Sequence, residues 1–507
     1  MSTLTPSYEE FKASASPGDF AGFLKRLPFL KEPFQTYRRF RGGAPSVLLE
    51  SAKVSAKMGR SSVVAKDPFL IFKAKGRHIE IQSYQTTEVL EADPFLVIGR
   101  ILKKLRSETH DGFPPFMGGA VGYFGYEAKN LLEPRLSQNS KDDLGLPDIY
   151  LLFFDQGILW DHLEGSSTLF VNIRVGKNLK KCYESAVRKI NALEADLRSC
   201  EKKKKVRASA GASRPFPASI HSSFSRPGFM EVVEKAKRYI KQGEVYQANL
   251  SQRFRFPMKE DPAAIYERLR KVNPSSFFGY LDAGDFQILS GSPERLVKLE
   301  NGVLETRPIA GTRSRGRTSE EDAQNALDLM LSEKERAEHI MLVDLERNDL
   351  GRVAEYGSVR VDELMRLEDY THVKHIVSNV QGALKPGLDA MDVLKAFFPG
   401  GTITGAPKLR CMEIIDELEP VARGPYTGSL GYLSFTGNMD MNIIIRSLVV
   451  HEETGYLNVG AGIVADSNPE REYEETLYKA ESLFNAIFGK GNTDAFLAKR
   501  GIASRIS

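Results

Sequence analysis

Hydrophobic and polar residues follow two different periods along the first 200 residues. In several stretches they alternate with the two-residue period of a β-strand, and in two others they repeat with the period of an amphipathic helix. The helical stretches are Phe95–Leu105 and Lys180–Arg198. The predicted strands lie at Ser46–Ser51, Phe69–Ile81, Tyr150–Trp160 and Ser167–Val175.

The second half of the chain repeats these patterns in longer groups. Helices are predicted at Phe229–Gln242, Glu320–Leu331, Lys334–Leu342 and Pro469–Ile487. Strands are predicted at Val245–Phe256, Phe277–Leu281, Phe286–Ser290, Leu296–Leu299, Leu430–Phe435, Met441–Val450 and Leu457–Val464. Strands and helices come in runs without strict alternation, which favours an α+β fold with antiparallel sheets over a doubly wound fold.

The composition changes between residues 201 and 227, where a basic run is followed by a stretch rich in Ala, Ser and Pro. Such a stretch has little to bury, so we interpret it as a linker. It separates an amino-terminal region, 1–200, from a carboxyl-terminal region, 228–490, and residues 491–507 form a predicted tail.

Composition and charge narrow the classes of function. The chain has 507 residues and a net charge of +4, too small to indicate nucleic acid as a partner. Cys182, Cys200 and Cys411 form neither a metal-binding pair nor a disulfide framework, which favours a reducing compartment. No signal-peptide pattern and no apolar run of membrane-spanning length occur, so we expect a cytoplasmic protein without a membrane partner.

A glycine-rich stretch between Phe397 and Arg446 is the first candidate binding element. Gly400, Gly401 and Gly405 permit a tight backbone with free amides, Thr402 and Thr404 add hydroxyls, and Lys408 and Arg410 add positive charge. Ala-Pro-Lys stands where a phosphate loop requires Gly-Lys-Ser/Thr, so a nucleotide site is excluded. An anion site remains, for carboxylate or phosphate, with Arg446 as a bidentate clamp. A simple turn between strand and helix is the alternative.

Two acidic pairs are candidate metal ligands. Glu335 and Glu338 are three residues apart, as are Glu472 and Glu475, and Lys479 follows at i+4. This spacing places each pair on one helix face. Two facing pairs would form an incomplete oxygen cage of the kind that suits Mg²⁺. Exposed helix faces with ion pairs are the alternative interpretation.

Glu294 is a candidate proton donor. It follows a predicted strand and Pro293, so a fixed turn could aim its carboxyl into a cleft as a general acid; a solvent-facing turn residue is the alternative. His339 and His375 are candidates for proton transfer, although His375 lies in the apolar context of a core histidine. No Ser–His or Cys–His pairing is evident, so covalent acyl chemistry is not expected.

Five motifs together resemble the chorismate-utilising enzymes, a family that includes component I of anthranilate synthase and of aminodeoxychorismate synthase, with isochorismate and salicylate synthases as cousins. The motifs are Tyr246–Phe254, Arg307–Arg313, Leu342–Gly351, Thr404–Lys408 and Gly460–Val464. The match is specific from Phe229 to Phe488, and Leu48–Ser51 and Gly118–Glu127 extend it more loosely into the amino-terminal region. The resemblance implies two large, stacked, mainly antiparallel sheets flanked by helices, with the active site in a cleft.

The resemblance also implies roles for single residues. Glu338 and Glu475 would be the inner ligands of Mg²⁺, with Glu335 and Glu472 around them, and the ion would hold the ring carboxylate of chorismate. Glu294 matches the acid that protonates the departing hydroxyl. The residues that would bind or surround chorismate are Thr404, Tyr426, Arg446, Gly460, Ala461, Gly462, Ala310, Thr312, His375 and Lys479.

Two positions indicate the reaction. Relatives that add water have a lysine base where this chain has Gln247, so ammonia is the expected nucleophile, supplied by a separate glutamine amidotransferase subunit. Ala310 stands where many aminodeoxychorismate synthases have lysine, as in anthranilate synthases, but more motifs look closer to the aminodeoxychorismate enzymes. We therefore expect 4-amino-4-deoxychorismate, for the folate branch, as the product.

Two alternatives stay open. The first is component I of anthranilate synthase, for which Leu49, Glu50 and Ser51 would form a regulatory tryptophan pocket. The second, from another class, is a non-catalytic small-molecule binding protein built on the same fold.

Overall fold

We describe a computed structural model of the chain. It describes residues 4–28, 30, 32–43, 45–51, 59–108, 110, 112–136, 139–201, 219–370 and 373–501. Residues 202–218, which hold the basic run and most of the predicted linker, and the last six residues of the predicted tail lie outside the described residues.

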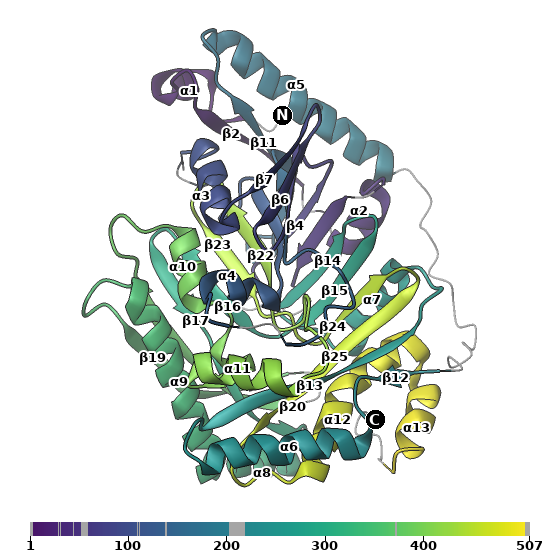
Figure 1. Cartoon of the computed structure of the whole chain (residues 1–507). Helices are drawn as coiled ribbons and strands as arrows, with labels where there is room; N and C mark the ends of the chain where they lie inside the picture. Colours follow the sequence, from purple (N-terminus) through teal and green to yellow (C-terminus); the bar gives the residue numbers. More distant parts are fainter. Residues whose placement is uncertain are drawn as a thin grey trace.

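Two large antiparallel sheets organise the described residues (Figure 1). The first sheet has the order β1 (Leu4–Thr5), β2 (Phe20–Leu27), β11 (Ser166–Arg174), β10 (Gln156–Asp161), β4 (Ser61–Lys66), β3 (Ser46–Glu50), β14 (Phe277–Asp282), β15 (Phe286–Ser292), β24 (Ser447–His451), β25 (Thr454–Ile463), β13 (Gln247–Pro257) and β12 (His221–Ser222), with β21 (Gly405–Ala406) paired to β13. The second has the order β18 (Ile309–Ser314), β20 (Val373–Ala383), β17 (Val303–Thr306), β16 (Arg295–Glu300), β23 (Met439–Asn442), β22 (Ser429–Ser434), β8 (Gly119–Phe124), β9 (Ile149–Phe154), β5 (Leu70–Lys75), β6 (His78–Ser83) and β7 (Thr87–Glu91), with β19 (Arg360–Asp369) paired to β20.

The helices flank these sheets (Figure 1). They are α1 (Tyr8–Ser14), α2 (Pro33–Phe40), α3 (Pro94–Lys104), α4 (Lys129–Leu132), α5 (Leu179–Glu201), α6 (Arg226–Lys241), α7 (Pro262–Val272), α8 (Ser319–Leu331), α9 (Glu333–Val353), α10 (Ala390–Phe397), α11 (Lys408–Leu418), α12 (Pro469–Phe488) and α13 (Lys490–Ala498). Within the described residues, no helix is long and apolar enough to cross a bilayer.

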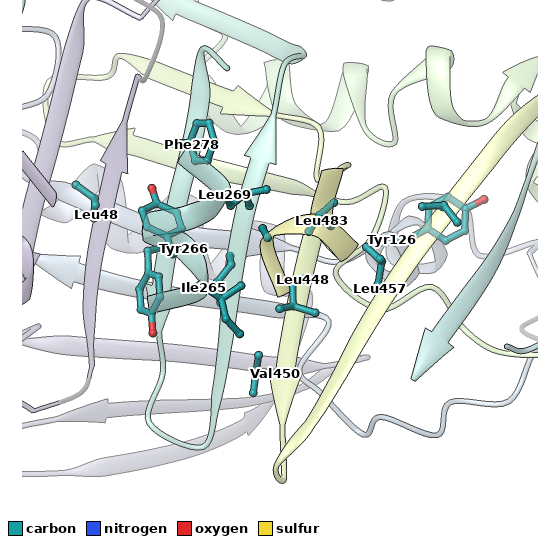
Figure 2. Close-up of a cluster of buried hydrophobic side chains, with 14 of the residues drawn as sticks. Leu48, Tyr126, Ile265, Tyr266, Leu269, Phe278, Leu448, Val450, Leu457 and Leu483 are labelled. Carbon is teal, nitrogen blue, oxygen red and sulfur yellow. The ribbon is translucent and has the colours of Figure 1, made fainter. Parts of the chain in front are cut away.

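Three hydrophobic clusters show how the layers stack. One joins residues of both sheets, such as Val47 with Tyr123, and therefore lies between them. A second packs the other face of the first sheet against α5, α6, α7 and α12; Figure 2 shows part of it, with Tyr266 and Leu269 of α7 beside Phe278 of β14. A third packs the second sheet against α3, α9 and α10. The predicted α+β sandwich of two stacked antiparallel sheets is confirmed.

Both regions of the sequence contribute to both sheets. Strand β3 of the amino-terminal region pairs with β14, and β8 pairs with β22, each in antiparallel register. The predicted boundary at 201–227 therefore separates two stretches of sequence whose strands share the same two sheets.

Several predicted elements differ from the observed ones. The single strand expected at Met441–Val450 is two strands, β23 and β24, which belong to different sheets and are joined by 443–446. The strand expected at Tyr150–Trp160 likewise divides between the two sheets as β9 and β10. Phe69–Ile81 is a β5–β6 hairpin that turns at Gly76, whose φ of 55° suits glycine.

One predicted helix was too short, and the predicted tail contains a helix. Helix α9 continues past the predicted end at Leu342 to Val353, because Val343, Leu350 and Val353 are buried on the same side. Residues assigned to a tail include α13, which buries Phe496 and Leu497 against the first sheet's helical layer.

Candidate active site

A cavity of about 560 Å³ lies where β13 and β25 of the first sheet face β18 and β20 of the second, with α9 and α12 alongside. It collects most of the residues that the sequence proposed. These are Gln247, Glu294, Ala310, Thr312, Glu335, Glu338, His375, Tyr426, Arg446, Gly460, Gly462, Glu472, Glu475 and Lys479.

Two predicted binding residues do not line the cavity. Thr404 is fully buried, and its hydroxyl donates to Gly400 O at 2.9 Å, so it supports the glycine loop from behind while Thr402 and Ile403 face the cavity. Ala461 points away because side chains alternate along β25, and it belongs to the helix-facing core. The Thr404 side chain therefore does not line the cavity as predicted, whereas the contact predicted for Ala461 is through its backbone amide and stays a prediction.

Lys408 and Arg410 also face away from the cavity. The Lys408 ammonium pairs with Asp349, and Arg410 pairs with Glu244 and Glu413. The positive charge that the sequence ascribed to the glycine loop is therefore neutralised elsewhere.

Arg446 supplies positive charge to the cavity. It lies on the segment that crosses from β23 to β24 and has a φ of 50°, and its carbonyl accepts from Gly291 N at 3.2 Å. Among the described residues its guanidinium makes no ion pair, although burial lowers its pKa. A desolvated guanidinium without a partner stabilises an anion strongly, and its fork matches a carboxylate.

Glu294 occupies the turn after β15. Its backbone is fixed twice, because its N–H donates to Ser292 Oγ at 3.2 Å and its carbonyl accepts from Ile443 N at 3.1 Å. Burial raises the pKa of its carboxyl to about 7, against the lowering effects of a Thr402 hydrogen bond and of the Arg446 and Lys479 charges. A carboxyl with this pKa is half protonated at neutral pH and can act as a general acid.

The four acidic residues of α9 and α12 line the same cavity from two sides. Burial raises the pKa of Glu338, and the neighbouring charges of Glu335 and Glu475 raise it further. Burial also raises the pKa of Glu472, and the neighbouring charge of Glu475 raises it to a smaller extent.

Two of these carboxylates already have cationic partners. Glu475 pairs with Lys479 at 2.8 Å, and Glu335 with Arg313 at 3.1 Å. Within the described residues, no three His, Cys, Asp or Glu side chains stand close enough together to form a complete ligand set. A divalent cation here would have to take its remaining ligands from substrate or water, so the Mg²⁺ site stays a prediction.

Glycines on β25 make room for amide side chains on β13. A Cβ at Gly462 would lie 2.5 Å from Gln247 Nε2, and one at Gly460 would lie 2.8 Å from Asn249 Oδ1 and 2.9 Å from the Tyr426 hydroxyl. The Gln247 and Asn249 side-chain oxygens are buried without hydrogen-bond partners among the described residues. Both therefore offer acceptors to a ligand that carries N–H or O–H groups.

The histidines have different surroundings. His375 lies on β20 with Nδ1 at 2.9 Å from Gly311 O and 3.2 Å from Thr312 Oγ1, and its ring packs edge-on against Tyr370. His339 is buried with Nε2 at 2.6 Å from Ser378 Oγ, and burial lowers its pKa to about 4, so it is a core residue.

Sequence reasoning missed Asn249 and Tyr370, which also line the cavity. Asn249 carries a detectable signal, because it is two residues from Gln247 and thus on the same face of a strand. Tyr370 follows the end of β19, and no local pattern distinguishes it from other aromatic residues.

Leu49, Glu50 and Ser51 do not belong to this cavity. Glu50 pairs in register with Phe278 of β14, and its buried carboxylate lies 2.6 Å from Arg270 Nε. Burial raises the pKa of Glu50. The tryptophan pocket stays a prediction.

Three comparisons with known proteins bear on this cavity. The model of the family described as chorismate binding enzyme matches residues 46–485. The chain is 42% identical over 460 residues to anthranilate synthase component 1 of Acetivibrio thermocellus, covering 90% of this chain and 93% of that one. It is 44% identical over 469 residues to aminodeoxychorismate synthase component 1 of Bacillus subtilis (strain 168), covering 91% and 96%. The structure matches anthranilate synthase component I from Streptococcus pneumoniae TIGR4 with a TM-score of 0.73 and 34% identity, covering 85% and 93%.

Proposed function

Because the chain belongs to the family of chorismate binding enzymes, and is a chorismate-utilising enzyme of the aminodeoxychorismate and anthranilate synthase component I type, we propose that it aminates chorismate with ammonia to give 4-amino-4-deoxychorismate. One observation carries this proposal: the cavity joins a carboxyl whose pKa is about 7, Glu294, to an arginine without an ionic partner among the described residues, Arg446. Together they suit an anionic substrate that loses a hydroxyl group.

Arg446 and Tyr426 hold the enolpyruvyl carboxylate in this proposal. The guanidinium donates two parallel hydrogen bonds, and the nearby glycine backbone at Gly460 lets the ligand approach β25 closely. This places the ring between the anion site and the acidic residues of α9 and α12.

Glu338 and Glu475 would hold Mg²⁺, with Glu335 and Glu472 around them. When bound, the ion supplies charge neutralisation for the ring carboxylate and so assists departure of the hydroxyl. The residues of the chain provide the oxygens and, through the pairing of Lys479 with Glu475, a positive charge at their edge.

Glu294 protonates the departing hydroxyl, which leaves as water while ammonia forms the new C–N bond. The attacking nitrogen then gives up a proton, which returns the Glu294 carboxyl to its acidic form. Gln247 and Asn249 support ammonia as the nucleophile, because their buried acceptor oxygens suit N–H donors and neither amide can remove a proton from water.

The product separates two closely related functions. The residues of Tyr246–Phe254 and Ser292–Arg295 favour 4-amino-4-deoxychorismate, as needed for 4-aminobenzoate and folate, whereas Ala310, at the cavity wall, favours anthranilate and pyruvate for the tryptophan branch. A binding protein without activity would have no use for a buried carboxyl with a pKa of about 7 in the same cavity as Arg446.

A glutamine amidotransferase subunit is the proposed source of ammonia. The relatives are named as component 1, which supports a second component for this chain. We further propose that the enzyme works in the cytoplasm.

One chromatogram tests the proposal. Purified chain, chorismate, Mg²⁺ and ammonium salt at raised pH should give a product that retains its enolpyruvyl group and that a separate lyase converts to 4-aminobenzoate. Adding an amidotransferase subunit should let glutamine replace ammonium. Anthranilate released without a lyase would overturn the proposed product, and no loss of chorismate under either condition would overturn the activity itself.

A further inference from the structure

Arg423, just before the turn that carries Tyr426, is a buried hub of hydrogen bonds outside the residues assigned so far. Its Nε–H donates to Glu419 Oε2 at 2.9 Å, and one terminal nitrogen donates to Ile403 O at 3.1 Å and to Thr427 Oγ1 at 3.2 Å. The other donates to Asn249 O at 2.7 Å and to Glu419 Oε1 at 2.6 Å. All five N–H donors of the guanidinium therefore have acceptors.

These acceptors belong to separate walls of the cavity. Ile403 comes from the glycine loop and Asn249 from β13, and both line the cavity. The guanidinium carbon also lies 5.8 Å from the centroid of the Tyr426 ring, which lines a third wall. A single side chain thus connects three segments that surround the substrate.

The turn that Arg423 supports is strained. Thr427 has a φ of 60°, a conformation that costs energy for a β-branched residue. Its N–H donates to Ile444 O at 2.8 Å, and two residues later Arg446 also has a positive φ. Strained backbone persists where surrounding contacts over-determine it. Here Arg446 lines the cavity, and Thr427 directly follows Tyr426, which also lines it.

Arg423 is itself held from two sides. Glu127 of the amino-terminal region accepts from the backbone N–H of Arg423 at 2.8 Å and of Gly424 at 2.9 Å. Glu419 Oε1 also accepts from Ser251 N at 2.7 Å. These contacts hold both the backbone of Arg423 and the carboxylate that its guanidinium meets.

We infer that Arg423 is a positioning residue, which holds Tyr426 and the glycine loop at Ile403 in the arrangement that binds chorismate. Through Thr427 and Ile444 it also positions the backbone of Arg446. This inference rests on the proposed use of the cavity for chorismate but not on the identity of the product. Lysine cannot replace Arg423, because an ammonium has three donors and no planar fork.

The test compares Arg423→Lys with Arg253→Lys. Arg253 is a buried arginine of β13 that donates to Ala422 O at 3.2 Å and pairs with Asp143. It does not line the cavity, and among the described residues the contacts of its guanidinium are with residues that do not line it either. The readouts are the dissociation constant of chorismate with Mg²⁺ and without ammonia, by calorimetry, and KM and kcat from total chorismate loss. Thermal midpoints establish that both variants are folded.

Arg423→Lys should weaken chorismate binding and raise KM at least about tenfold, with a loss in kcat/KM of about 100-fold, since small misplacements of binding groups have effects of this size. Arg253→Lys should stay within about threefold of wild type in each constant. A general loss of folded protein would instead lower kcat at an unchanged KM. An unchanged KM and dissociation constant in Arg423→Lys, or equal losses in both variants, would overturn the inference.

If Arg423→Lys does not fold, Thr427→Gly decides the question. Glycine accepts the positive φ but removes the hydroxyl that Arg423 contacts, so the fold is retained while the turn is released. A raised KM and weaker chorismate binding support the inference, and wild-type values overturn it. A wild type that binds chorismate but does not consume it refutes the proposed function alone, since the binding readout still compares the variants.

Discussion

Replacing Glu294 by glutamine should stabilise the protein at alkaline pH while removing its activity. The folded state holds the proton of this carboxyl more tightly than the unfolded state, because burial raises its pKa from 4.5 to about 7. Wild-type stability therefore decreases as the pH rises from about 4.5 to about 7 and then levels off, as the buried group becomes ionised. Glutamine keeps the shape of the side chain but does not titrate, so the variant escapes this loss.

The size of the effect follows from the pKa. A shift of about 2.5 units corresponds to about 3 kcal/mol in total, of which about 2.5 kcal/mol falls between pH 5 and pH 8. With an unfolding entropy of about 2.1 cal/mol/K per residue, a chain of 507 residues converts this into roughly 2 °C of thermal midpoint. The midpoint of Glu294→Gln relative to wild type should thus rise by about 2 °C between the two pH values.

Differential scanning calorimetry without Mg²⁺ or chorismate measures this difference. Glu346→Gln is the matched control: Glu346 is also buried, with its pKa raised to about 8 by burial and by Asp349, but it does not line the cavity. It should show the same sign of stabilisation with near-native turnover. Glu294→Gln should lose about 10²–10⁴-fold in kcat, the usual contribution of a general acid.

The difference in thermal midpoint between Glu294→Gln and wild type could instead be the same at pH 5 and pH 8. That result would show that the Glu294 carboxyl is ionised throughout this range, and it would refute its role as a general acid. In the wild type, kcat/KM measured at fixed free NH₃ should decrease above about pH 7, as the acidic form of Glu294 is lost. A rate that is level from pH 6 to pH 9 at fixed free NH₃ would refute the same reasoning.

Other substitutions test the remaining roles. Glu338→Gln and Glu475→Gln should each abolish turnover at low Mg²⁺, because a neutral amide is a poor ligand for a hard cation, and near-native activity would remove the metal assignment. Chelation by EDTA should likewise stop the wild type. Gln247→Lys should introduce a base that activates water and yield an isochorismate-type product. Normal chorismate binding without any water addition would contradict the idea that residue 247 decides between ammonia and water as the nucleophile. Gly460→Ala should raise the KM for chorismate, because the added Cβ would lie 2.9 Å from the Tyr426 hydroxyl. A wild-type KM would show that Tyr426 can move aside without loss of binding.

The sequence predicted elements well where one face is strongly apolar. Helix α12 and strand β13 were located within a few residues, since their apolar residues follow the helical and strand periods, as Leu250, Phe254 and Phe256 do on one face of β13. The division of Met441–Val450 between two sheets has no local signal, because both halves are apolar and the change of sheet depends on Arg446 adopting a positive φ. Periodicity reports which face is buried and not which sheet buries it.

The candidate site shows the same limit. Residue types and spacing identified the acidic pairs and Glu294, and the structure brings them to one cavity. The sequence could not show that Lys408 pairs with Asp349, which is 59 residues away, or that Arg423 connects three cavity walls. Those facts depend on contacts between distant segments, and a buried arginine looks like a surface one until its acceptors are known.

The sharing of both sheets by the two regions has a consequence for how the chain reaches its native state in the cell. When residue 201 has been synthesised, β3 and β8 each still lack a neighbour, because β14 and β22 are not yet made. At the usual ribosomal rate, the nascent chain needs roughly 10–50 s to reach Ser434, the end of β22. During that time two strand edges and the apolar surfaces beside them are open to other chains, so the amino-terminal half is exposed to aggregation until the rest of the chain is made.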